Sequence, residues 1–191
     1  MSGDSAPINL TNHFLIAMPG LVDDLFSKSV VYVCEHSARG ALGLVINKPA
    51  DIKMAGLFGK VELPLQRTDL TDSPVFHGGP VQVERGFVLH EPDPSAYAST
   101  MDIPGGLAMT TSKDVLEALS GGAGPQKVLV TLGYSSWGEG QLESELAANS
   151  WLTVDADRRL IFDTPVQQRY DAALALLGLQ SWMISTQVGH A

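Results

Sequence analysis

The stretch "SVVYVCEHSARGALGLVINKP", residues 29–49, decides the fold class. It holds two apolar, partly β-branched runs, at 29–36 and 40–49, and the polar loop "SARG" separates them. This pattern predicts a β-hairpin, in which two neighbouring strands run antiparallel. A hairpin of this kind does not fit a doubly wound sheet built only from alternating strands and helices.

The segments on either side of this hairpin extend the same interpretation. "HFLIAMP", residues 13–19, predicts a preceding strand, and the short link to the hairpin predicts one packed turn with Leu25 and Phe26 inward. After the hairpin, a short helix within residues 51–60 is expected to turn Met54, Leu57 and Phe58 inward. An exposed loop is expected to follow over residues 61–74, which contain two prolines and many polar side chains.

The second half of the chain mixes helices with further strands. The predicted elements are a helix capped by Thr111 or Ser112 and stopped at Gly121 and Gly122, a strand at 127–134, a helix at 139–150, a strand at 151–154 with a hairpin partner at 159–162, and a helix from Pro165 to Gly178. Hairpins and strand-helix-strand units therefore occur together, and the sequence predicts an α+β fold.

The segment "FHGGPVQVERGFVLH", residues 76–90, raises the question of a phosphate-binding loop. Such a loop must lead into a helix N-terminus, whereas here the alternation of "VQVE" and the run "FVLH" indicate a strand. Gly78, Gly79 and Pro80 are therefore interpreted as a sharp bend, and Arg85-Gly86 as a turn or bulge that redirects the strand.

Composition limits the classes of function. The 191 residues are expected to form one domain, 1–191, with flexible ends at 1–11 and 183–191. A formal net charge of −9 makes direct nucleic-acid binding unexpected, and no apolar run is long enough for a membrane span. The single cysteine, Cys34, and the lack of a signal peptide predict a cytoplasmic protein.

Several blocks in this order resemble one known family. They are "FLIAMP", "SVVYVCEHSARGALGLVINKP", "HGGPVQVERGFVLH", "TSKDVLEALSGGAGP", "LGYSSWGEGQLESELAANSWL" and "IFD". Together they span residues 12–180 and resemble the AlgH/YqgE family of bacterial proteins. The resemblance implies a bifurcated, partly barrel-like β-sheet surrounded by helices. It implies no reaction and no catalytic residues; part of the family name comes from a proposed regulatory link to alginate synthesis.

Two side chains offer a nucleophile for an alternative function, a small hydrolase. Ser135 lies in "GYSSW", which matches the start of a G-x-S-x-G nucleophile elbow but has Trp137 in place of the last glycine. Cys34 lies close to His36 in sequence, although a cysteine within an apolar strand is more typical of a buried core residue. Neither residue comes with a complete catalytic set.

The favoured hypothesis is a non-enzymatic regulatory or interaction module that binds a protein or a small ligand. Its role in transcriptional regulation would be indirect. The predicted binding surface combines two glycine-rich loops with an aromatic side chain: His77, Gly78 and Gly79, then Gly133, Trp137, Gly138, Gly140 and Gln141. No cofactor or metal is expected, because the histidines lack the short ligand spacings of metal motifs. Carboxylates near residue 141 are expected to cap the following helix themselves, and a buried Trp137 would make this loop part of the core.

Overall fold

A computed structural model describes residues 8–20, 26–93 and 96–188. The strands are β1 (His13–Ala17), β2 (Val30–Ser37), β3 (Gly40–Val45), β4 (Pro49–Lys53), β5 (Pro74–His77), β6 (Val81–His90), β7 (Thr100–Asp102), β8 (Ala108–Thr110), β9 (Val128–Trp137) and β10 (Trp151–Asp155). The helices are α1 (Met54–Lys60), α2 (Asp114–Ser120), α3 (Gln141–Ala147), α4 (Arg158–Phe162), α5 (Arg169–Leu176) and α6 (Ser181–Val188), with short 3-10 turns at Thr68–Leu70 and Val166–Gln168.

The predicted hairpin is confirmed and lies inside one mixed sheet. β2 pairs antiparallel with β3, and β1 lies on the other side of β2. The main path of the sheet runs β10-β1-β2-β3-β9-β6-β8-β7, and β4 and β5 form a side branch. The α+β class and the bifurcated sheet are thereby confirmed.

The sheet divides along β9, which has two different neighbours on one edge. Its first half pairs in parallel with β5, through Phe76 opposite Thr131, and its second half pairs antiparallel with β3, through Gly43 opposite Ser135. β6 pairs along the other edge. Gly133, with a φ of 79°, lies at the point where the β5 and β3 branches separate.

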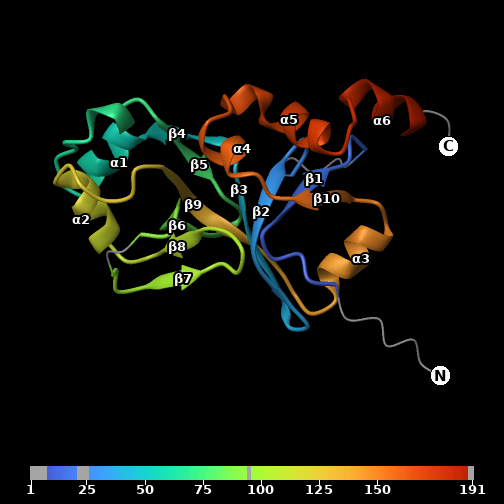
Figure 1. The fold of residues 1–191 in the computed structure, drawn as a ribbon, viewed down its shortest axis with the longest axis horizontal. Coiled ribbons are helices and arrows are strands. Elements are labelled where there is room, and N and C mark those ends of the chain that lie inside the picture. Colours follow the sequence, from blue (N-terminus) through green and yellow to red (C-terminus); the bar gives the residue numbers. More distant parts are fainter. Residues whose placement is uncertain (1–7, 21–25, 94–95, 189–191) are drawn as a thin grey trace.

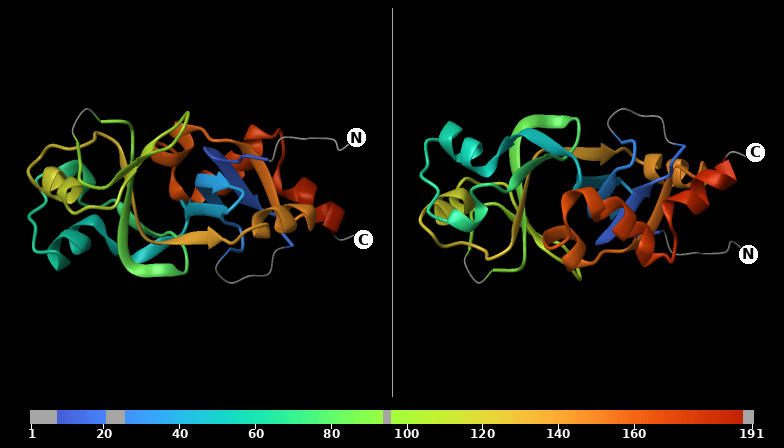
Figure 2. Two further views of the ribbon diagram at one scale, coloured as in Figure 1. Left: turned by 90° about the horizontal axis from the view of Figure 1, so that it is seen from below. Right: turned by 90° about the horizontal axis from the view of Figure 1, so that it is seen from above.

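The two branches form two lobes, with β9 running from one to the other (Figure 1). One lobe holds α1 and α2 against β4 to β8; the other holds β1, β2, β3 and β10 with α3 to α6. Figure 2 shows the same division from below and from above. In the second lobe, α3 lies on one face of the sheet and α5 on the other, so β1 and β2 are buried on both faces. This two-sided burial explains the nearly continuous apolar runs of these strands.

The first half of the chain follows the sequence expectations closely. Helix α1 turns Met54, Leu57 and Phe58 into the core, as expected. The helix begins later than expected, because residues 51–53 belong to β4. Phe26 packs against the core beside α3, whereas Leu25 lies outside the described residues. The register of β6 on β9 shifts between Val81 and Gly86, in agreement with the predicted turn or bulge.

The segment at 159–162 was predicted wrongly as a hairpin strand. It forms α4, because the Asp157 side chain accepts a hydrogen bond from the backbone N–H of Arg159 at 2.9 Å and caps a helix there. β10 pairs with β1 instead. Helix α2 also differs, since Lys113 rather than Thr111 or Ser112 occupies its N-cap position and makes no side-chain cap.

The strand predicted over 127–134 continues to Trp137, so the whole "GYSSW" segment lies within β9. Helix α3 is correspondingly shorter than the predicted 139–150. Of the predicted flexible ends, residues 1–7 and 189–191 lie outside the described residues. Leu10 is buried, and Ser181–Val188 form α6, which the sequence analysis did not anticipate.

Candidate functional site

The predicted glycine loop lies where the two branches of the sheet meet. The N–H of Gly78 donates to the Leu132 carbonyl of β9 at 2.9 Å, and its carbonyl accepts from the Val45 N–H at 3.0 Å. His77, half-buried at the end of β5, donates its N–H to the Lys48 carbonyl at 2.7 Å. We call Gly78, Gly79, Gly133 and Ser135 the glycine fork.

The glycines of the fork allow two backbone segments to touch. A β-carbon added to Gly79 would lie 2.2 Å from the Tyr134 carbonyl carbon, and one added to Gly78 would lie 2.4 Å from the Gly133 oxygen. One added to Gly133 would lie 2.6 Å from the Gly79 oxygen. Gly79 and Gly133 also have positive φ angles, at which other residues are strained. The space at the fork is therefore filled by the chain itself.

Ser135 belongs to this packing. Its side chain is buried, and its Oγ donates to the Gly78 carbonyl at 3.1 Å. The serine lies within the second half of β9, rather than in the strand-to-helix turn that a nucleophile elbow requires.

Trp137, four residues beyond Gly133 and so about 13 Å further along β9, is 5% exposed. Its ring packs with Phe26 and Trp151, at centroid distances of 6.4 and 6.2 Å. The Nε1–H groups of Trp137 and Trp151 both donate to Oε1 of Glu145, at 3.0 and 2.9 Å. Trp137 is therefore a core residue. We call Phe26, Trp137, Trp151 and Glu145 the indole cluster.

The remaining predicted residues close the loop between β9 and α3. Gly138 and Gly140 are exposed, and Gly140 has a φ of 75° at the N-cap of α3. The Gln141 side chain accepts from the Gly138 N–H and donates to Oε2 of Glu145, each at 3.0 Å. The Gln141 side chain thus ties the loop to α3, while the first group of predicted residues lies at the fork, on a different part of β9.

The structure also separates the second candidate nucleophile from its suggested base. Cys34 lies at a β-bulge between Val33 and Glu35, and its side chain is packed in the core on the α5 face. His36 is turned to the opposite face of the sheet, on which α3 lies. Its Nδ1 accepts from the Leu10 N–H at 2.9 Å, and its Nε2 lies 3.3 Å from Oε2 of Glu143. Burial raises the pKa of the Cys34 thiol above its usual range.

A cleft that the sequence analysis did not identify lies between the two lobes. It has a volume of about 280 Å³. Its walls come from α1, β5 and the start of β9 on one side, and from the end of α4 and the segment that joins it to α5 on the other. Most of the lining residues are apolar, and they include Met54, Phe76, Val128, Val130, Ile161 and Val166. The polar members are Ser73, Asp163, Thr164 and Arg169, and polar and apolar atoms contribute similar shares of the exposed surface.

Arg169, the first residue of α5, is the most unusual of these side chains. It is 6% exposed, and its guanidinium stacks on the Phe76 ring with the carbon 5.0 Å from the centroid. Nε donates to the Thr164 carbonyl at 3.0 Å and Nη1 to the Ile46 carbonyl at 2.5 Å. Within the described ranges, no ion pair includes this arginine. Burial lowers the pKa of Arg169 to about 10, so the group is charged at neutral pH.

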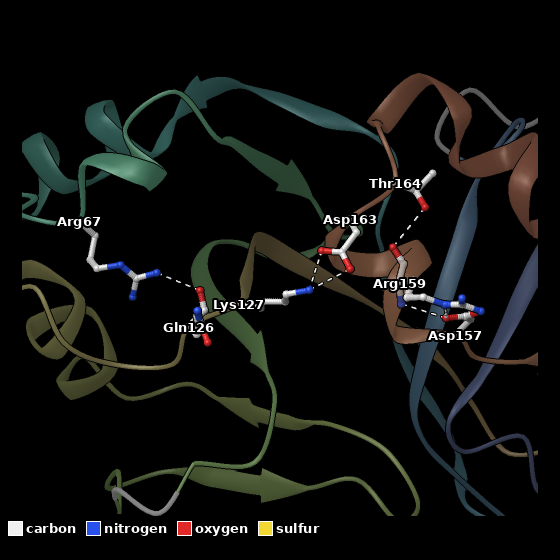
Figure 3. A network of polar contacts seen from close by, with 7 residues as sticks. All are labelled: Arg67, Gln126, Lys127, Asp157, Arg159, Asp163 and Thr164. Carbon is white, nitrogen blue, oxygen red and sulfur yellow. Dashed lines mark hydrogen bonds and ion pairs between the residues drawn. The ribbon is translucent and has the colours of Figure 1, made fainter.

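One edge of the cleft carries an ion pair between the two sides. Lys127, just before β9, reaches both carboxylate oxygens of Asp163, at 2.7 and 2.9 Å (Figure 3). Further contacts hold the neighbouring segments, since Arg67 donates to the Gln126 carbonyl and Thr164 donates to the Arg159 carbonyl. The carboxylate of Asp163 is therefore engaged by Lys127 rather than by Arg169.

The sequence carries no local signal for this cleft. Arg169 follows "PVQQ" at a helix start, where a basic residue is normally an exposed side chain, and its burial depends on Phe76 and Ile46, which are far away in sequence. Across the described residues, no helix has the length and apolar character to cross a membrane. No cluster of three or more His, Cys, Asp or Glu side chains suited to a metal ion is found in that same part of the chain.

Comparison with protein families and known proteins gives one consistent result. A family model described as AlgH-like matches residues 14–182. A UPF0301 protein from Polaromonas sp. is 74% identical over 195 residues, and one from Paracidovorax citrulli is 68% identical over 213; each alignment covers both chains fully.

Solved structures agree with the fold. The solution structure of the AlgH protein from Pseudomonas aeruginosa is 46% identical, covers 98% of each chain and superposes with a TM-score of 0.78. A crystal structure of a Corynebacterium diphtheriae protein shares the fold at 16% identity, with a TM-score of 0.68 over 86% of this chain and 85% of that one.

Proposed function

The chain belongs to the AlgH-like family, and from that premise we propose that it is a non-enzymatic module that binds a small ligand in the cleft between its lobes. A regulatory role would follow from ligand occupancy, and any influence on transcription would be indirect. The observation that carries the proposal is a hollow between the lobes, lined by both apolar and polar side chains, one of which is the buried, charged Arg169.

The predicted loops have a supporting role in this proposal. Gly78, Gly79 and Gly133 bring backbone segments into contact at the glycine fork, and the indole cluster with Gln141 closes the other end of β9. Their contacts are satisfied within the chain, which favours a scaffold that holds the lobes together. The cleft instead offers an open volume whose lining combines apolar side chains with a few polar ones. This combination is typical of ligand pockets.

The surroundings of the two candidate nucleophiles favour binding over hydrolysis. A serine nucleophile needs a base that accepts its proton, whereas the Ser135 hydroxyl donates to a backbone carbonyl. A cysteine nucleophile acts as the thiolate, and burial disfavours the thiolate of Cys34.

A fragment screen tests the proposed binding site. A mixed set of neutral, cationic and anionic fragments is added to the 15N-labelled protein, and changes in amide chemical shift are recorded. We expect several fragments to shift residues around Val128 and Thr164. Val166→Phe, which places a bulkier side chain in the cleft, should remove these shifts. Val83→Phe, at an exposed position outside the cleft, is the matched control and should retain them.

Two results would count against this function. One is a screen in which no fragment of any charge shifts the cleft residues. The other is turnover of ester, phosphate or peptide substrates by the wild-type protein that Ser135→Ala or Cys34→Ala abolishes, which would favour the hydrolase instead.

A further inference from the structure

The positive charge of Arg169 is only partly balanced inside the protein. Its hydrogen-bond acceptors among the described residues are two neutral carbonyl oxygens, and its guanidinium also contacts the face of Phe76. Buried arginines normally pair with a carboxylate, because removing the charge from water is otherwise costly. The site therefore has capacity for one more negative group.

One nitrogen of this guanidinium remains available. Within the described part of the chain, Nη2 has no hydrogen-bond partner. In that same part, the single buried side-chain nitrogen or oxygen without a partner is Glu143 Oε1. Nη2 of Arg169 therefore keeps some access to solvent, and the cleft is a solvent-filled space that Arg169 lines.

From these contacts we infer that the cleft binds a small organic molecule with a single carboxylate on an apolar body, and that the carboxylate is held by Arg169. The inference rests on the proposed function and adds the chemical class of the ligand. An arginine N–H edge makes strong, charge-assisted hydrogen bonds to a carboxylate.

The surrounding charges favour a monoanion over a phosphate. The second cation near the cleft, Lys127, is already paired with Asp163, whose carboxylate lies on the edge of the same space. A doubly charged phosphate ligand would find only one available cation, Arg169, and would be repelled by the negative Asp163 side chain. The single charge of a carboxylate ligand is balanced by the Arg169 guanidinium alone.

The walls favour an apolar ligand body of modest size. The partly exposed apolar side chains of Val128, Phe162 and Val166 line the cleft together with Arg169, and each apolar contact they make with a ligand gains from the removal of water. A volume of about 280 Å³ is at the lower end of the range of small-molecule sites. An arylalkanoic or branched aliphatic acid fits this description.

Matched probes test the chemical class in the full-length protein. The probes are 3-phenylpropanoate, its neutral amide and phenyl phosphate, each titrated while the amide shifts of the cleft residues are followed. We expect 3-phenylpropanoate to bind about tenfold or more tightly than the amide, because only the acid makes a charge-assisted hydrogen bond, and more tightly than phenyl phosphate.

Variants then assign the effect to the guanidinium. Arg169→Met should weaken binding of 3-phenylpropanoate by about tenfold or more while changing the affinity for the amide little. Arg39→Met, at an exposed position in the β2–β3 turn, removes the same charge from the whole protein and should leave both affinities unchanged. Because Arg169→Met removes two hydrogen bonds to carbonyls, Arg169→Lys provides a second variant that keeps the charge, and it should retain preference for the acid.

The outcomes separate the two proposals. Equal binding of acid and amide in the cleft, or tighter binding of phenyl phosphate, would overturn the carboxylate inference and leave the cleft as a ligand site. Acid binding that Arg169→Met does not weaken would also overturn it. Failure of every probe to shift cleft residues would overturn the inference. The proposed function would fall with it only if the mixed fragment screen also gave no shifts there.

Discussion

The glycine fork and the cleft between the lobes lie along the same strand pair, β5 and β9, with the cleft near the start of both strands and the fork further along, and they differ in almost every physical respect. The fork is conspicuous in the sequence, yet its glycines touch backbone atoms and leave no room for a ligand. The cleft has no motif, yet it contains a hollow and a charged side chain without a carboxylate partner in the described structure. A glycine-rich motif can therefore mark close packing, while a binding site can be assembled from unremarkable residues.

The largest expected effect comes from filling the fork. In Gly79→Ala, the new methyl group would overlap the Tyr134 backbone at 2.2 Å, at a φ of 155° that alanine rarely adopts. We expect a loss of about 3 kcal/mol or more in the free energy of unfolding, measured by urea denaturation.

Gly59→Ala is the matched control, since Gly59 lies in α1 with no atom within 4 Å of the added methyl group. We expect it to change stability by less than about 1 kcal/mol, in the stabilising direction. Equal effects of the two substitutions would show that the fork is not closely packed.

The indole cluster should give the next largest effect. Glu145→Ala leaves the Nε1–H groups of Trp137 and Trp151 without their shared acceptor, which should cost about 2 to 4 kcal/mol. Glu145→Gln keeps an acceptor oxygen and should cost clearly less. Thermal unfolding followed by tryptophan fluorescence measures the stability of both variants. If Glu145→Ala left the stability unchanged, the two indole N–H groups would not depend on Glu145, and the loop would be available to bind other partners.

Alkaline pH should expose how completely Cys34 is enclosed. In the unfolded chain the thiol ionises near its ordinary pKa of about 8.5, whereas burial raises its pKa in the folded protein. The contribution of the buried thiol to the free energy of unfolding is therefore fully present below the pKa of the unfolded chain. Above that pKa the free energy of unfolding falls by about 1.4 kcal/mol per pH unit.

Unfolding measured between pH 8 and 10.5 should therefore show a smaller decline in stability for Cys34→Ala than for the wild type. Burial is also the main cause that raises the pKa of Tyr32, so most of its contribution is common to both proteins, and only the smaller part due to Cys34 is lost with the substitution. Parallel declines would mean that the thiol is accessible in the folded state.

Ser135→Ala should have the smallest effect of the series. It removes one hydrogen bond, from Oγ to the Gly78 carbonyl, and we expect a loss of about 1 kcal/mol. Binding of 3-phenylpropanoate should be unchanged, because the residue belongs to the fork rather than to the cleft. A loss of binding without a loss of stability would place the ligand at the fork.

The sequence was informative where local chemistry controls the structure. The β2–β3 hairpin follows from its polar loop, α1 from the spacing of Met54, Leu57 and Phe58, and the bend at Gly78 and Gly79 from residues that permit unusual backbone angles. The bifurcated sheet was expected from the family resemblance rather than from any of these patterns.

Other features depend on contacts between distant segments. "RLIF" is too short for periodicity to separate strand from helix, and the cap by Asp157 decides the outcome. The length of β9 depends on its pairing with β3, and the burial of Arg169 depends on Phe76 and Ile46. No pattern within ten or fifteen neighbouring residues contains this information.

One measurement tests the central claim most directly, that ligands bind in the cleft and not at the fork. In protein labelled with 15N-valine, Val128, Val130 and Val166 report on the cleft, while Val45 and Val81 report on the fork. Titration with 3-phenylpropanoate should shift the three cleft signals progressively and leave the two fork signals in place. Shifts confined to Val45 and Val81 would contradict the account and return the binding site to the glycine loops.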